Sequence, residues 1–245
     1  MSTRRILDYQ QKCSRSYLSS IELPADYRYP DGAPIRPLPP LKVAVGGLMI
    51  IGAYPSARFE QRQSRLKPGK FRTVPIADNL QPFGREEYFD GLKPTVLVSG
   101  ETLAEYLLQP LEIEADHCWI TDLVKVFLYK DTHIDSCSDS VPGFRGTETR
   151  SSFKSLARQS LSWIREECEI CKPKVVVALG QEVAQVISGH NSWSATRLLS
   201  LRPNAPESLG HIPTIYAPHP DACRRYPKWR RHIKKQIPII ESMLR

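Results

Sequence analysis

The sequence predicts an α/β fold with three layers, in which helices cover both faces of a central, mostly parallel, four-stranded sheet. Short segments that are apolar throughout recur along the 245 residues, which is typical of strands buried on both faces. Segments with helical spacing separate them, and this alternation favours parallel strands. The hydrophobic content of 41% is enough for one substantial core.

The chain is predicted to consist of an N-terminal arm with a proline-rich lead-in, residues 1–40, and a single domain, residues 41–245. Residues 1–25 fit a short helix. Residues 29–40 contain five prolines and are therefore expected to be extended. The sequence leaves the function of this region open.

The first predicted strand lies at residues 42–52, where the apolar residues of KVAVGGLMIIG do not alternate with polar ones. The pair Gly46 and Gly47 weakens its beginning. Residues 57–94 are polar and broken by proline and glycine, which predicts a long irregular excursion. An excursion of this length in a compact domain is either functional or mobile, and we favour a functional one.

The remaining elements alternate between helices and strands. A helix is expected at 99–111 with Ser99 as its N-cap, and a long amphipathic helix of more than twenty residues from Glu148. The other predicted segments are a strand at 117–129, a polar loop at 130–147, a strand at 172–180, a helix at 181–189 and a strand at 212–220. In such a sheet the site lies beyond the carboxyl ends of the strands.

The positive charge favours a polyanionic partner, with simple solubility as the alternative. Lys and Arg total 34 against 26 Asp and Glu, a net charge of +8. Much of the excess follows His219, where residues 221–235 hold seven cations beside Tyr226 and Trp229. The candidate DNA-binding residues are Arg224, Arg225, Lys228, Arg230 and Arg231.

The six cysteines have no regular spacing, and the N-terminus has no apolar signal core. No apolar run approaches the roughly 18 residues of a membrane-spanning helix. We therefore expect a reduced, monomeric, cytoplasmic protein without membrane contact, associated with the nucleoid if it is bacterial.

Several segments, in their order and spacing, resemble the uracil-DNA glycosylase superfamily. They are IIGAYPS, QPF, WITDLVKVF and KPKVVVALG followed by APHP, between about residues 48 and 225. The resemblance is greatest to the branch that includes iron-sulfur members. It implies the three-layer fold and excision of a base that is flipped out of DNA.

In that family the turn after the first strand, Gly-x-x-Pro, carries an Asp, Asn or Glu that positions the attacking water. Gly52 and Pro55 fit this frame, with Ser56 after it, but Ala53 and Tyr54 supply neither acid nor amide. A phenol is a poor base at neutral pH.

The replacement candidates for the missing acid are Asp78 and Asn79, which lie shortly before Phe83. An Asx turn is the alternative reading of the pair. Glu86, Glu87 and Asp90 are weaker candidates. If none of these residues holds the water, the activity is altered or absent.

The resemblance assigns three further roles. Phe83 would stack on the flipped base, Asp122 would read its edge, and His219 would donate to the leaving base. Structural roles in the core are the alternatives for Phe83 and His219. The family has Asn where Asp122 stands, and an ionised carboxylate only accepts hydrogen bonds. Asp122 should therefore disfavour the O4 of uracil unless it is protonated, or it could instead pair with Lys125.

No cofactor and no metal are expected. The iron-sulfur members use four cysteines, two of them in an N-terminal Cys-x-x-Cys, whereas this N-terminal region contains only Cys13. Cys168 and Cys171 fall on the apolar side of the predicted long helix, where cysteine behaves as a small hydrophobic residue.

The sequence thus predicts a DNA-repair N-glycosidase that excises a damaged or deaminated base. One alternative is a nucleic-acid-binding protein that has kept the fold and lost the chemistry. A nucleotide- or nucleoside-binding enzyme is a third possibility, which the basic C-terminal segment disfavours.

Overall fold

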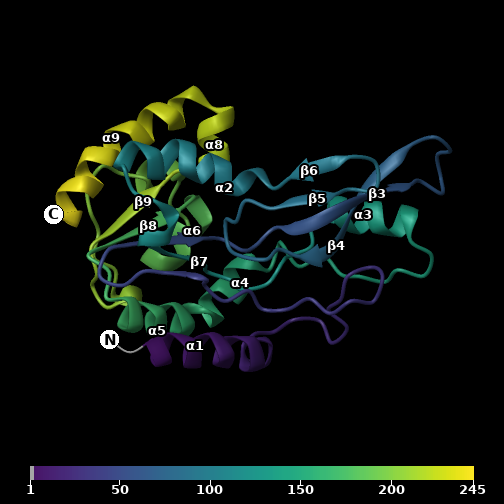
Figure 1. Cartoon of the computed structure of the whole chain (residues 1–245), viewed down its shortest axis with the longest axis horizontal. Coiled ribbons are helices and arrows are strands. Elements are labelled where there is room, and N and C mark those ends of the chain that lie inside the picture. The colour runs from purple at the N-terminus through teal and green to yellow at the C-terminus, as the bar shows by residue number, and fades with distance from the viewer. Residues whose placement is uncertain (1–2) are drawn as a thin grey trace.

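The computed structural model describes residues 3–245 and contains a central sheet of five strands in the order β1-β7-β2-β8-β9 (Figure 1). The strands are β1 Lys42–Val43, β2 Leu48–Gly52, β7 Cys118–Asp122, β8 Val175–Leu179 and β9 Thr214–Ala217. The last four are parallel, and β1 is an antiparallel edge strand on β7. The predicted mostly parallel α/β architecture is confirmed, with one short strand more than expected.

The extra strand arises because the first predicted strand is broken in two. Gly46 adopts a φ of 81°, a left-handed conformation that glycine accepts readily and that ends the extended segment after β1. The chain then enters β2, in which every residue is buried. In the pairing register Gly52 lies opposite Asp122, so the carboxyl ends of β2 and β7 are level.

Helices cover both faces of this sheet (Figure 1). One face carries α1 Thr3–Ser16, α4 Phe153–Gln159, α5 Leu161–Cys171, α6 Gln181–Ser188 and α7 Ala195–Leu198. The other carries α2 Val98–Leu103, with the helical turns 104–111 that continue it, α8 Pro220–Arg225 and α9 Pro227–Leu244. These helices bury their apolar residues in the two cores on either side of the sheet, as a three-layer fold requires, and α1 packs on the outside of α5 (Figure 1).

The predicted N-terminal helix is present as α1 and packs into the same core as the sheet. Tyr9, Cys13 and Tyr17 are almost fully buried against α5. The hydroxyl of Tyr17 lies 2.6 Å from that of Ser160. This arm is therefore a packed part of the core.

Two of the predicted helical and loop segments are wrong, and so is the N-cap predicted for the helix at 99–111. The long helix from Glu148 is split at Ser160, whose hydroxyl donates to the Leu156 carbonyl at 2.8 Å and so competes with the helical hydrogen bonds. The expected loop at 130–147 contains the helix α3 Asp131–Ser140. The helix α2 has Leu97 at its N-cap, and Ser99 lies inside its first turn.

The predicted strand 117–129 pairs only over β7. Beyond Asp122 the chain turns across the end of β2, because the amides of Leu123 and Val124 donate to the carbonyls of Gly52 and Ala53. Residues 123–129 are buried but do not pair as a strand. Their apolar side chains pack into the core, which explains why the sequence resembles a longer strand.

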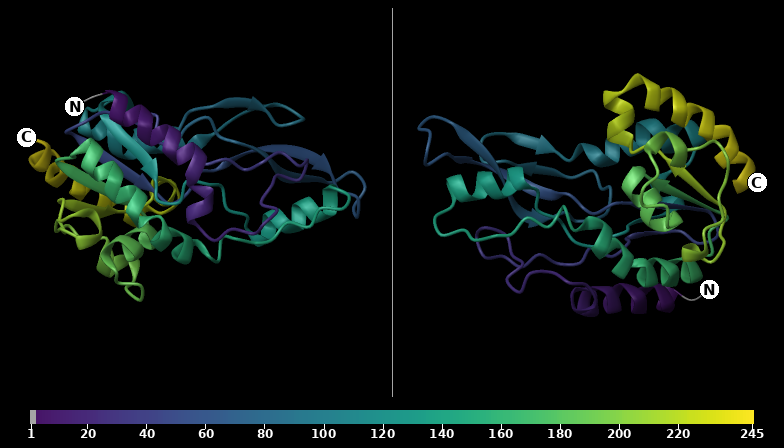
Figure 2. Two further views of the ribbon diagram at one scale, coloured as in Figure 1. Left: turned by 90° about the horizontal axis from the view of Figure 1, so that it is seen from below. Right: turned by 180° about the vertical axis from the view of Figure 1, so that it is seen from behind.

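The irregular excursion expected at 57–94 instead forms two antiparallel hairpins. They consist of β3 Ala57–Gln63 with β4 Phe71–Asp78, and β5 Glu87–Phe89 with β6 Pro94–Val96. Both are only partly buried, so their sequences lack the apolar runs that mark a buried strand. The β3–β4 hairpin projects from the body beside α3 (Figure 2).

Candidate functional site

A cavity of about 830 Å³ lies at the carboxyl edge of the parallel strands. Residues that follow or end each of these strands line it. They are Ala53, Tyr54, Pro55 and Ser56 after β2, Asp122 at the end of β7, Gly180 to Glu182 after β8, and His219 after β9. This is the location that the strand topology predicts for a ligand site.

Gly52 supports the cavity without lining it. A Cβ atom at this position would lie 2.2 Å from Asp122 Oδ1 and 2.4 Å from Phe83 Cε2. Glycine therefore allows the carboxyl group and the aromatic ring to approach the end of β2 together. Phe83 itself has a φ of 50°, which is unusual for a bulky residue, and its ring lies 6.2 Å from that of His219.

Gly52→Ala is expected to lower the free energy of unfolding by about 1–3 kcal/mol, because the added methyl group overpacks this contact. Urea denaturation measures the change. Gly47→Ala is the matched control at the other end of β2, where a Cβ atom would meet only the His117 carbonyl at 3.6 Å. Equal stabilities for the two variants would contradict this account of Gly52.

His219 is held as the N-cap of α8. Its Nδ1 accepts a hydrogen bond from the Asp221 amide at 3.2 Å, so in the neutral imidazole the proton lies on Nε2. Burial lowers the pKa of His219, and the nearby Arg225 guanidinium lowers it further, whereas Asp221 raises it. The side chain can thus present one N–H donor to the cavity without carrying a charge.

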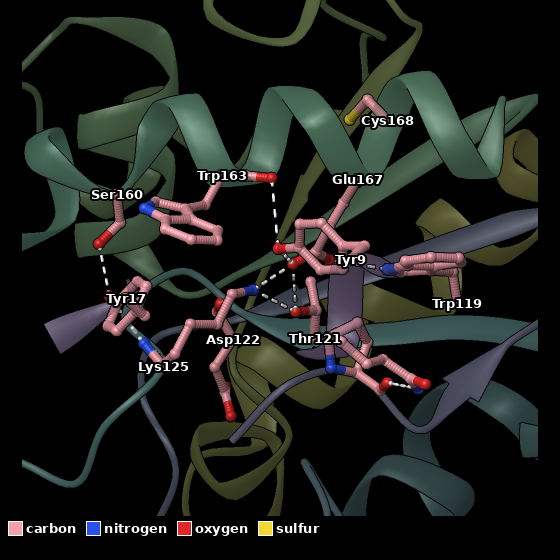
Figure 3. A network of polar contacts seen from close by, with 12 residues as sticks. Tyr9, Tyr17, Trp119, Thr121, Asp122, Lys125, Ser160, Trp163, Glu167 and Cys168 are labelled. Carbon is pink, nitrogen blue, oxygen red and sulfur yellow. Dashed lines mark hydrogen bonds and ion pairs between the residues drawn. The ribbon is translucent and has the colours of Figure 1, made fainter. Parts of the chain in front are cut away.

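Asp122 contributes a buried carboxyl group to the cavity. Its side chain is turned away from the polar cluster around Glu167 (Figure 3), and the residue is only 2% exposed. Burial raises the pKa of Asp122 to about 7; Lys125 lowers it and Glu167 raises it. This carboxyl group therefore changes its ionisation near neutral pH.

The alternative pairing of Asp122 with Lys125 is wrong. The ammonium group of Lys125 forms its ion pair with Glu167, and both side chains are fully buried. It touches Asp122 only at the backbone carbonyl, at 2.8 Å. The lysine thus holds the end of β7 in place and leaves the Asp122 side chain free for the cavity.

Tyr54 lies in the wall of the cavity beside Arg150 and Phe153. The guanidinium carbon of Arg150 is 5.3 Å from the centre of the Tyr54 ring, and Arg150 is paired with Glu182. Burial raises the pKa of Tyr54, although the Arg150 charge opposes this, so the phenol stays protonated at neutral pH. Tyr54 is therefore no base in this arrangement.

Asp78 and Asn79 face in different directions, as neighbours at the end of a strand do. The Asp78 carboxylate accepts from the Tyr29 hydroxyl at 2.8 Å and from the Arg36 amide at 3.1 Å, and it does not line the cavity. The interpretation of Asp78 as the acid that holds water does not fit these contacts. Asn79 does line the cavity, and its Oδ1 has no protein donor within residues 3–245.

The weaker candidates lie in structural contacts or on the surface. Glu86 pairs with Arg58 at 3.1 Å and Asp90 accepts from the amides of its own turn, while Glu87 is exposed. Sequence reasoning missed Arg150, Glu182, Lys130 and Lys154, which also line the cavity. Only Glu182 could have been found from the sequence, because it follows the end of β8 by three residues.

The basic segment forms the outer surface of α8 and the first turns of α9. Arg224 and Arg225 share one carboxylate, that of Asp221. Arg230 lies over the Tyr106 ring, and Lys228 lies over Trp229. Arg231 is exposed. The helix α8 begins directly after His219, which lines the cavity, but none of these five cations is itself among the lining residues.

The six cysteines are free thiols buried in the core. Burial raises the pKa of Cys13 and Cys171 to about 12. Cys168 packs against the Met49 sulfur. Residues 3–245 contain no group of three or more His, Cys, Asp or Glu side chains placed to hold a metal ion.

Fold and cavity together define an α/β protein with a pocket of polar, charged and aromatic side chains at the carboxyl ends of its parallel strands. The family model described as the uracil DNA glycosylase superfamily matches residues 46–240, and this chain belongs to that superfamily. Among curated proteins no significant match was found. Within residues 3–245, none of the helices is both long and apolar enough to cross a lipid bilayer.

Proposed function

We propose that this protein is a DNA glycosylase that flips a damaged or deaminated base into the cavity and hydrolyses its N-glycosidic bond. The observation that carries the proposal is His219, a neutral, capped imidazole at the cavity with Nε2–H free to donate. Membership of the uracil DNA glycosylase superfamily supports the same chemistry.

The extruded base would enter between Phe83 and the end of β7. A phenylalanine ring at the mouth of a pocket gives any base a flat face on which to stack. Ala53, Pro55 and Ser56 would form the floor and the wall nearest the sugar, supported from behind by Gly52, with Tyr54 held by Arg150. The cavity volume of about 830 Å³ is ample for one nucleotide.

Asp122 would read the hydrogen-bonding edge of the base. In its protonated form the carboxyl group has one donor and one acceptor, which matches the N3–H and O4 of uracil as an amide would. In its ionised form it only accepts, and then suits an edge with two donors. A pKa of Asp122 near 7, raised by burial, makes both forms available near neutral pH.

His219 would stabilise the leaving base. When the bond between C1′ and the base nitrogen breaks, its electron pair stays on the base, and Nε2–H can donate to the oxygen where this charge develops. Buried donors of this kind supply much of the electrostatic stabilisation of transition states. Because His219 is uncharged, it needs no proton from solvent before each cycle.

Asn79 would orient the attacking water. Its Oδ1 is buried and has no protein donor within residues 3–245, so the side chain would turn toward the cavity to accept a hydrogen bond from water. The sugar in such reactions has oxocarbenium character, so the nucleophile needs only weak activation. The water oxygen bonds to C1′, and its proton completes the released base. Arg224, Arg225, Lys228, Arg230 and Arg231 would contact backbone phosphates beside the lesion.

His219→Ala is expected to lower the rate of base release by a factor on the order of a hundred or more, the scale for losing one such donor. Single-turnover excision measures this on duplexes that contain uracil, hypoxanthine, xanthine or a mismatch, with alkaline cleavage of the abasic sites. DNA affinity should stay the same, because the backbone contacts remain.

Two variants separate the chemistry from the structure. His219→Asn keeps a side-chain acceptor at the α8 N-cap, so we expect it to restore stability but not excision. His117→Ala removes an exposed histidine at the opposite edge of the sheet and should change neither. If the wild-type protein binds DNA with steep salt dependence but excises no base of the panel, it is a binding protein and the proposal fails.

A further inference from the structure

The tip of the β3–β4 hairpin, residues 64–71, carries a cluster of exposed cations. Arg65, Lys67 and Lys70 are exposed, and none of the three has an ion-pair partner within residues 3–245. Between them Leu66 is 76% exposed, and the adjoining Phe71 is 50% exposed. Unpaired cations around apolar side chains form a surface suited to a polyanion.

The backbone of this tip is held in one shape by Asp139 of α3. Its carboxylate accepts from the Ser64 hydroxyl at 2.7 Å, the Leu66 amide at 3.0 Å and Arg72 Nε at 2.6 Å. The hydrogen bonds from Arg72 and Ser64 lower the pKa of Asp139 to about 2. The Ser64 amide also donates across the turn to the Lys70 carbonyl. A preorganised tip loses less conformational entropy when it binds.

The hairpin leaves the body at the cavity. The strand β3 begins five residues after β2 ends, and its residue Phe59 lines the cavity together with His133 of α3. Both α8 and the hairpin therefore start from the carboxyl edge of the sheet. From Phe59 to Gln63, the last residue of β3, the strand rises about 13 Å at 3.3 Å per residue, and the tip lies beyond it.

We propose that the hairpin tip is a second DNA-binding element, which contacts the phosphates of duplex DNA more than about four base pairs from the extruded base. This lower bound is the rise of β3 from Phe59 to Gln63 divided by the 3.4 Å spacing along a DNA strand, and the tip lies beyond Gln63. This inference rests on the proposed function, from which the position of the extruded base is taken. Proteins that bind the minor groove also use apolar side chains beside cations, and Leu66 is an exposed apolar side chain of this kind.

Duplex DNA explains the placement of these cations better than an acidic protein partner does. The cations of α8 and the cavity-lining Lys130 and Lys154 lie at the same edge of the sheet as the hairpin, so one extended polyanion can contact all of them. A spacing of several base pairs between contacts is natural for a duplex, whose phosphates repeat regularly along its length.

The test compares two duplexes with the same central lesion, one with flanks of about four and one with flanks of about twelve base pairs. Wild type should bind the long duplex at least tenfold more tightly. The triple variant Arg65→Gln, Lys67→Gln, Lys70→Gln should lose that difference, and the slope of log affinity against log salt should fall by about 2.7 for three contacts. Its excision on the short duplex should be unchanged.

The control removes three charges at the opposite edge of the sheet, with Arg5→Gln, Lys172→Gln and Lys174→Gln. Lys172 and Lys174 lie just before β8, Arg5 of α1 pairs with Glu169 of α5, and none of the three lines the cavity. The control should keep the preference for the long duplex. The proposal is overturned if the hairpin variant keeps it too, as expected of a tip that binds a protein, or if the control loses it equally. Binding of uncleaved DNA gives this answer even if no base is excised.

Discussion

Lys125→Met is expected to lower the free energy of unfolding by about 3–5 kcal/mol, the range for breaking a buried ion pair by removing one partner. Lys125 and Glu167 have no exposed side-chain surface. The methionine fills a similar volume, but the Glu167 carboxylate then stays in the core without a cation. Urea denaturation followed by tryptophan fluorescence measures the loss.

Glu167 would keep only neutral donors in this variant. Trp119 Nε1 donates to it at 2.7 Å, Thr121 Oγ1 at 3.2 Å, and the Tyr9 hydroxyl donates from α1 (Figure 3). These donors cannot balance a full charge at low dielectric. The cluster also connects the N-terminal helix to the strand that ends at Asp122, so the same variant should loosen α1.

The double variant Lys125→Met, Glu167→Met removes both charges, and it should be clearly more stable than the sum of the two single changes predicts. Lys172→Met is the control on the surface, where we expect a change within about 0.5 kcal/mol. A loss below about 1 kcal/mol for Lys125→Met would show that water reaches the pair and that the charges are not buried together.

Asp122→Asn is expected to make the protein more stable above pH 7, by up to about 4 kcal/mol. The folded-state pKa of Asp122 is raised by burial to about 7, against about 3.9 in an unfolded chain. The folded protein thus binds more protons than the unfolded chain between these two values, and wild-type stability falls as pH rises from about 4 to 7. Asparagine cannot ionise, so the variant avoids this loss.

The difference in the free energy of unfolding between wild type and Asp122→Asn should therefore be smallest near pH 4 and should grow as pH rises. Denaturation at pH 4.5, 6 and 8 measures the difference in the free energy of unfolding. Glu167 and Lys125 lie behind Asp122 in both proteins, and their contribution cancels in the comparison. Parallel stability curves over this range would refute the proposed ionisation of Asp122.

The same variant has a matching effect on base release. If the excised base has the edge of uracil, wild-type excision should fall above pH 7 as Asp122 loses the proton that it donates, whereas Asp122→Asn should show no fall there. If the excised base has two donors on its edge, wild-type excision should instead rise as pH increases through 7. The pH dependence thus indicates which kind of edge the pocket reads.

Much of the fold could be predicted because its strands are buried on both faces. The apolar runs in β2, β7, β8 and β9 mark them without reference to the rest of the chain. The two hairpins at 57–96 could not be found in this way, since strands that are half exposed and polar carry no such run. Nor could the break at Ser160, because a helical pattern continues through a residue whose hydroxyl bonds back to its own helix.

The candidate site was partly predictable for a similar reason. Asp122 and His219 lie at one cavity because parallel strands bring their carboxyl ends to one edge, and Phe83 reaches the same cavity from the loop between β4 and β5. Asp78 and Asn79 could not be told apart by sequence, since only the direction of the chain at the end of β4 decides which one faces the cavity. Arg150 belongs to the cavity through its pairing with Tyr54 and Glu182, which are distant in sequence.

The sequence by itself determined the parallel sheet, the edge where the site lies, the resemblance to the superfamily and the basic character of the chain. These properties follow from local patterns of apolar, turn and charged residues. Only the tertiary structure decided the ionisation of Asp122 and His219, the pairing of Lys125 with Glu167 and the reach of the hairpin. Each of these depends on which distant segments exclude water from a side chain or fix its direction, and burial of that kind is a property of the assembled fold.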